Sequence, residues 1–218
     1  MNELELKNLW QSAHDKLEVS IEMNKKNAED ISRMKVRSLL GSMKPMKILV
    51  LLLGAVWVGV GTSLLSQIYL HAFSEANKFF LFSASIQIFL TAIALWVYVY
   101  QLITINMVDV SEPVVETQKR LIRLKMSTLW VTRILFLQLP VWTTFWWNGS
   151  MLADWNLVQW ILPVTVTVAF TCASIWLFFN IKYENRNRKW FQLIFNGKEW
   201  TPLMKSMELL EQVETREE

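Results

Sequence analysis

Long stretches without a charged side chain are the feature that most constrains this chain. Residues 48–70, 79–105 and 158–181 contain no Asp, Glu, Lys or Arg, and residues 129–147 contain one, Arg133. Roughly 20 apolar residues in a helix are enough to cross the ~30 Å hydrocarbon core of a bilayer. The sequence therefore predicts four transmembrane helices at these positions.

The predicted fold is all-α: an integral membrane four-helix bundle with amphipathic cytoplasmic helices at both ends. We divide the chain into a cytoplasmic amphipathic helix at 1–44, a transmembrane domain at 45–181, and a cytoplasmic interfacial segment with a C-terminal helix at 182–218. The single cysteine, Cys172, excludes an intramolecular disulfide. The expected partner of residues 45–181 is the lipid bilayer.

The third predicted span contains two unusual residues. Pro140 has no backbone N–H for the Phe136 carbonyl and predicts a kink. Arg133 is expected to snorkel, with its stem in hydrocarbon and its guanidinium at the interface. The alternative is a buried Arg133 that pairs with Gln101 or Gln138.

The distribution of Lys and Arg predicts the orientation. The segment before the first span contains nine of them, the 106–128 connection four and the tail from residue 182 seven, whereas the other face has Lys78 alone. By the positive-inside rule both termini are cytoplasmic. Tryptophans 146, 147, 155 and 160 then fall at the outer boundary, where an aromatic belt is expected. The net charge of +3 is explained by this orientation and does not indicate nucleic-acid binding.

Apolar residues at helical spacing continue outside the spans. Leu6, Trp10, Leu17 and Ile21 begin a stripe along an N-terminal helix, and we take these four as candidate partner-binding residues. Gly41, Ser42 and Pro45 are expected to interrupt this helix before the membrane. Because Asn24 and Asn27 occupy core places of the stripe, we expect it to dock on the other cytoplasmic segments rather than form an autonomous coiled coil.

The tail is predicted to contain two short elements. Residues 189–195 mix aromatic and basic side chains, a pattern typical of a segment that lies in the membrane interface. Thr201 and Pro202 open another helix, whose apolar stripe needs burial against the N-terminal helix, a second copy of the chain, or a partner. Together the cytoplasmic segments are expected to form a small helical subdomain.

The sequence shows no pattern of residues that indicates catalysis, a cofactor or a metal site. His14 and His71 fall on opposite sides of the membrane, which rules out a His pair. Glutamines 67, 87, 101, 138 and 159 in the spans are interpreted as contacts between helices, with a solute path as the alternative. Small residues at packing distance, Ala55 with Gly59 and Ala169 with Ala173, predict close helix contact.

Several segments carry a resemblance to a known family. These are Asn-Ile-Lys-Tyr-Glu-Asn-Arg-Asn-Arg-Lys-Trp-Phe at 180–191, Asn-Gly-Lys-Glu-Trp-Thr-Pro at 196–202, and Leu9 with Trp10. With them the chain resembles an uncharacterised family of four-span membrane proteins of Bacteroidota. The resemblance implies the bacterial inner membrane and, because such proteins often accompany sigma-factor genes, a regulatory partner in the cytoplasm. It supplies no functional residues.

The favoured hypothesis is a non-enzymatic, multi-pass inner-membrane anchor or regulator that binds a cytoplasmic protein. Nearly all of the non-membrane mass lies on the cytoplasmic side, and this asymmetry motivates the hypothesis. The alternatives are a small transporter or channel and an accessory subunit of a larger membrane complex. A homo-oligomer is compatible with each of them.

Overall fold

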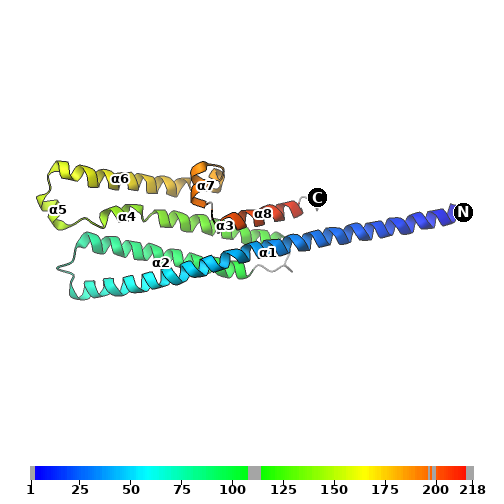
Figure 1. Ribbon diagram of the computed structural model, residues 1–218, viewed down its shortest axis with the longest axis horizontal. Coiled ribbons are helices and arrows are strands. Elements are labelled where there is room, and N and C mark those ends of the chain that lie inside the picture. Colours follow the sequence, from blue (N-terminus) through cyan, green and yellow to red (C-terminus); the bar gives the residue numbers. More distant parts are fainter. Residues whose placement is uncertain (1–2, 108–113, 196, 198–199, 215–218) are drawn as a thin grey trace.

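The computed structural model describes residues 3–107, 114–195, 197 and 200–214, and regular structure in this part of the chain is entirely helical. Four helical legs run side by side along the long axis (Figure 1). They are α1 (Glu3–His71), α2 (Lys78–Asn106), the consecutive pair α3 (Val114–Phe136) and α4 (Leu139–Thr144), and α6 (Leu157–Asn180). The connecting α5 (Gly149–Asp154) precedes α6, and η1 (Tyr183–Asn185), α7 (Lys189–Phe195) and α8 (Trp200–Glu214) follow it.

Within the described residues three helices, α1, α2 and α6, are long and apolar enough to cross a membrane, which indicates a multi-pass membrane protein. They contain the predicted stretches 48–70, 79–105 and nearly all of 158–181. The fourth predicted span, 129–147, is divided between α3 and α4, and neither helix alone has the length and composition of a span.

Pro140 accounts for the division. The α3 helix ends at Phe136, whose carbonyl would have needed the N–H that proline lacks. The chain tightens at this point: Leu137 N donates to the Ile134 carbonyl at 3.1 Å and Gln138 N donates to the Leu135 carbonyl at 3.2 Å, both three residues back. The predicted kink is confirmed.

One continuous helix of 69 residues, roughly 100 Å long, forms α1. The predicted interruption at Gly41, Ser42 and Pro45 is therefore wrong. Pro45 lies on the exposed side of the helix, whereas Met43 and Lys47 on either side of it are fully buried against the rest of the chain. Packing on both sides of the proline thus holds the helix in line and overrides the local helix-breaking preference.

Two glycines on α1 allow α2 to approach closely. A Cβ atom at Gly54 would lie 2.5 Å from Leu95 Cδ2, and one at Gly61 would lie 2.7 Å from Ile88 Cδ1. Ala55 and Gly59 are exposed, and a Cβ atom added at Gly59 would meet nothing within 4 Å, so the predicted contact through these two residues is wrong. Ala169 and Ala173 are also exposed. Close packing of the first two spans depends on Gly54 and Gly61.

Polar side chains connect α2 to the third leg along its length. Three contacts are spaced along the interface: Ser83 with Thr144 at 3.0 Å, Gln138 Nε2 donating to Thr91 Oγ1 at 3.1 Å, and Gln101 Nε2 donating to Thr128 Oγ1 at 3.5 Å. The interpretation of Gln101 and Gln138 as interhelical contacts is confirmed. Gln67 and Gln159 are exposed instead.

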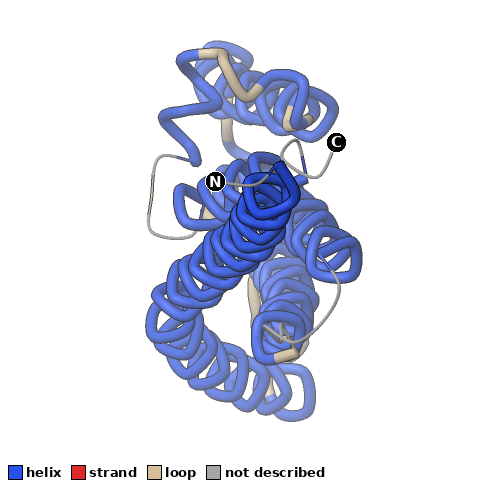
Figure 2. The backbone as a smooth tube through the Cα atoms, turned by 90° about the vertical axis from the view of Figure 1, so that its right-hand side faces the viewer, coloured by secondary structure: helices blue, strands red, loops and turns tan. Residues whose placement is uncertain are grey.

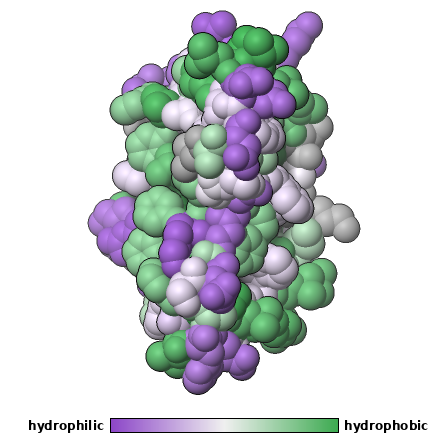
Figure 3. All heavy atoms as spheres, turned by 90° about the vertical axis from the view of Figure 1, so that its left-hand side faces the viewer, coloured by the Kyte–Doolittle hydropathy of each residue, from purple (hydrophilic) through white to green (hydrophobic). Residues whose placement is uncertain are grey.

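Short links and aromatic rings make up the end of the molecule opposite the termini. The Trp160 ring lies 5.4 Å from that of Trp147 and 5.7 Å from that of Trp155. The side chain of Asn77 caps α2, and the side chain of Asn148 caps α5 by accepting from Met151 N at 2.9 Å. Viewed from this end, hydrophilic residues are interspersed among large hydrophobic ones (Figure 3). The tryptophans thus cluster at one end of the molecule, and their place at the outer membrane boundary stays a prediction.

Candidate functional site

The N-terminal part of α1 extends well beyond the other helices (Figure 1) and is seen end-on in Figure 2. Three of the candidate partner-binding residues lie on one face of it and are exposed: Trp10 at 71%, Leu17 at 60% and Ile21 at 59%. The side chain of Leu6 lies outside the described residues. The expectation that this stripe docks on the chain's own cytoplasmic segments is wrong, because the unbroken α1 carries it past them.

A different stretch of α1 packs against the C-terminal helix. Val36, Leu40 and Met43 are fully buried, and α8 packs against α1. Their spacing of four and three residues places them on one helical face. The sequence analysis did not predict these residues, although their spacing of four and three residues was a signal that could have found them.

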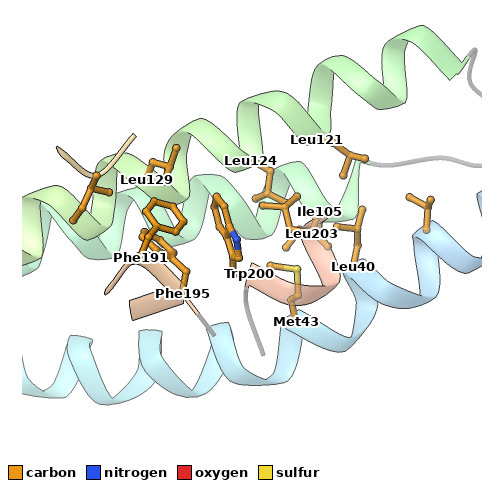
Figure 4. Close-up of a cluster of buried hydrophobic side chains, with 12 residues drawn as sticks. Leu40, Met43, Ile105, Leu121, Leu124, Leu129, Phe191, Phe195, Trp200 and Leu203 are labelled. Carbon is orange, nitrogen blue, oxygen red and sulfur yellow. The ribbon is translucent and has the colours of Figure 1, made fainter. Parts of the chain in front are cut away.

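The buried stripe of α1 belongs to a core shared by five helices, which we call the cytoplasmic subdomain after the side of the membrane on which the sequence predicts it (Figure 4). The other helices contribute Ile105 from α2; Leu121, Leu124 and Leu129 from α3; Phe191 and Phe195 from α7; and Trp200 and Leu203 from α8. Stacking of Phe191 on Phe195, with ring centroids 4.3 Å apart, fixes α7 against Trp200, whose ring lies 4.8 Å from that of Phe195. Helices from both ends of the chain therefore pack into one core at this end of the molecule.

The α7 helix differs from the interfacial segment that its composition predicts. Phe191 and Phe195 are buried in the cytoplasmic subdomain and do not face lipid. Leu193 is highly exposed, and Trp190 contacts the ring of Trp176 on α6 at 5.0 Å. The two phenylalanines of α7 therefore pack inside the protein, whereas Trp190 packs at the surface next to the spans.

Lys47 is fully buried where α1 passes from the cytoplasmic subdomain into the bundle. Its Nζ donates to Gln101 Oε1 at 2.6 Å and lies 4.5 Å from the centre of the Tyr98 ring. Gln101 in turn donates to Thr128 on α3. A buried cation is stable only when it is hydrogen-bonded, so this chain of contacts ties α1, α2 and α3 together at one level. The sequence suggested only that Lys47 ends the charged segment.

Arg133 connects the third leg to the end of α6. Its Nε and Nη2 donate to the Ile181 carbonyl at 2.8 and 2.6 Å, and its guanidinium lies 5.6 Å from the Trp130 ring. A cation is favourable at a helix C-terminus, where carbonyl groups lack partners. The alternative pairing with Gln101 or Gln138 is wrong, whereas the snorkelling of the guanidinium to the interface stays a prediction.

A cavity of about 700 Å³ lies between α3 and α8, and we call it the α3–α8 groove. Lys125, Arg186 and Lys205 line it, and Glu208 is the one acidic residue among its described lining residues. The Lys125 ammonium lies 3.9 Å and the Arg186 guanidinium 4.5 Å from the centre of the Tyr183 ring. Burial, and secondarily the like charge of Arg186, lower the pKa of Lys125 from its ordinary value of 10.5. The groove therefore gathers positive charge.

Comparison of the chain with protein-family models, with curated proteins and with solved structures finds no match. Among the described residues, no group of three or more His, Cys, Asp or Glu side chains is arranged to hold a metal ion. Functional inference therefore depends on the geometry of the cytoplasmic subdomain, the α3–α8 groove and the projecting part of α1.

Proposed function

We propose that this chain is a four-span, non-enzymatic membrane anchor or regulator that binds a cytoplasmic protein through the projecting part of α1. The observation that carries the proposal is the exposed apolar face of Trp10, Leu17 and Ile21 on a helix held away from the rest of the molecule. An exposed amphipathic helix of this kind fits partners that offer a hydrophobic groove or a second helix.

Four crossings are favoured over three by the path of the chain. Taken together, α3 and α4 lie alongside α2 and α6 in Figure 1, and both helices contact α2 on one side and α6 on the other. If α3 and α4 together did not cross the membrane, the long apolar helix α6 would have to begin on the same side of the membrane as the end of α2. Its four-span topology also places both positively charged ends of the chain in the cytoplasm.

The resemblance to Bacteroidota membrane proteins suggests the kind of partner. It favours the bacterial inner membrane and a transcription regulator of the sigma-factor class, held at the membrane by α1. This part of the proposal rests on the resemblance alone, whereas the docking face rests on exposure and helix geometry.

The transporter alternative receives less support. Gln101 and Gln138, two of the polar residues that would line a path, donate hydrogen bonds to Thr128 and Thr91 on neighbouring helices. Gln87 borders a cavity of about 270 Å³ whose other lining residues are apolar or glycine. An apolar cavity of this composition suits a lipid chain better than a polar solute.

Two variants of the full-length protein test the docking face. Leu17→Ser/Ile21→Ser alters the proposed face, and Val19→Ser/Met23→Ser alters exposed residues on the opposite face of the same turns. A photoreactive residue at position 10, cross-linked in the native host, reports the partner by mass spectrometry.

The proposal predicts that the first variant loses a specific cross-linked cytoplasmic protein and the second retains it. If the cross-linked protein is a second copy of this chain, and the first variant loses this cross-link while the second retains it, the proposed face forms a homo-oligomer instead of binding a different protein. Equal cross-linking in wild type and both variants would contradict the proposed face.

A further inference from the structure

The α3–α8 groove lies at the level where the spans end on the cytoplasmic side. The α6 helix ends at Asn180, and Tyr183 and Arg186 follow within six residues. Lys125 lies four residues, roughly 6 Å along the helix, before the predicted third span at Leu129. The groove therefore opens near the depth of lipid headgroups in the proposed topology.

The cations of the groove form no ion pairs with acidic side chains of the described residues, although Glu208 also lines the groove. The Lys125 and Arg186 cations both contact the ring of Tyr183, so that one aromatic side chain holds the two positive charges in its neighbourhood. Convergent cations that repel one another are stabilised when an anion enters between them.

The walls of the groove suit an amphiphilic ligand. Leu121, Ile122 and Met204 provide apolar surface beside the three cations, and Thr201 provides a hydroxyl group. A volume of about 700 Å³ exceeds what a single phosphate group needs and leaves room for the atoms attached to it.

We propose that the α3–α8 groove binds the phosphate of an anionic phospholipid headgroup, with Lys125, Arg186 and Lys205 as the binding residues. The phosphate accepts hydrogen bonds from these side chains and neutralises their mutual repulsion. This site is separate from the docking face of α1 and stands whether or not a protein partner binds there. A free phosphate ester has the same chemistry, and the experiment distinguishes the two sources.

The test uses full-length protein in neutral detergent micelles, titrated with phosphatidylglycerol and with zwitterionic phosphatidylcholine, with the retained lipid counted by native mass spectrometry. The site variant is Lys125→Gln/Arg186→Gln. The matched control is Arg123→Gln/Arg188→Gln, which removes the same charge from exposed positions of the same two segments outside the groove. Circular dichroism confirms that each variant is folded, and Lys205→Gln serves as a milder site variant.

We expect wild type and control to retain phosphatidylglycerol in preference to phosphatidylcholine, and the site variant to bind it about tenfold more weakly. A second arm adds inorganic phosphate to protein in phosphatidylcholine and follows thermal unfolding. If phosphate raises the unfolding temperature of wild type and control but not of the site variant, the site is supported and its ligand is a soluble phosphate ester rather than a lipid. Equal weakening in the site and control variants, or no preference for the anionic lipid and no response to phosphate, overturns the proposal.

Discussion

Replacing Lys47 and Gln101 singly and together measures how strongly their buried contact holds the first three legs. Lys47→Met loses a charge-assisted hydrogen bond and is expected to cost about 2 kcal/mol of unfolding free energy. Gln101→Leu leaves the buried ammonium without this acceptor and is expected to cost more, about 3–5 kcal/mol. The double variant replaces both members by apolar side chains and should cost only about 2–3 kcal/mol.

The difference between the double variant and the sum of the single variants is the coupling energy, expected to be about 3 kcal/mol. Reversible unfolding in mixed dodecylmaltoside and dodecyl sulfate micelles, followed by tryptophan fluorescence, supplies the four free energies. Lys47→Met combined with Gln138→Leu is the control, because Gln138 bonds to Thr91 elsewhere in the interface and its effect should simply add. Additive behaviour of Lys47 and Gln101 would refute the contact at 2.6 Å as an energetic link.

Three further variants test the helix contacts and the groove. Gly61→Leu is expected to lower the unfolding temperature because its side chain meets Ile88, whereas Gly59→Leu faces open space and should leave it nearly unchanged; equal effects would contradict the assigned face. Lys125→Met is expected to be more stable than wild type at pH 7. Because burial and Arg186 lower the pKa of Lys125 in the folded protein, the unfolded chain binds this proton more tightly, and wild-type stability rises as the pH increases through the folded pKa toward 10.5. The stability advantage of Lys125→Met over wild type should therefore shrink in unfolding curves recorded at about pH 9–10, which approaches the ordinary lysine pKa. An advantage that stays constant with pH would show that packing rather than charge is responsible.

Residue patterns along the chain predicted much of the membrane part. Absence of charge located α2 and α6 to within one residue at each end, and Pro140 located the break between α3 and α4. These features follow from local chemistry, namely the cost of burying charge in hydrocarbon and the missing N–H of proline.

Features set by tertiary packing were not predictable in the same way. Pro45 signals a helix end, yet the burial of Met43 and Lys47 keeps α1 continuous. The aromatic residues of α7 have the composition of an interfacial segment, yet Phe191 and Phe195 fill the core of the cytoplasmic subdomain. In both cases the deciding neighbours lie on other helices, so no window of the sequence contains the information.

The continuity of α1 is also what leaves the docking face accessible. Trp10 lies 26 residues before Val36, the first buried residue of the stripe that contacts α8, and this corresponds to roughly 40 Å of helix. A break at Pro45 would have freed the N-terminal segment to fold back and bury Trp10, Leu17 and Ile21 on the other cytoplasmic segments, which is the docking that the sequence pattern predicted. A rigid helix cannot do so, because bending it requires breaking consecutive backbone hydrogen bonds. The same packing that fixes α1 in the cytoplasmic subdomain thus keeps its far end available to a partner.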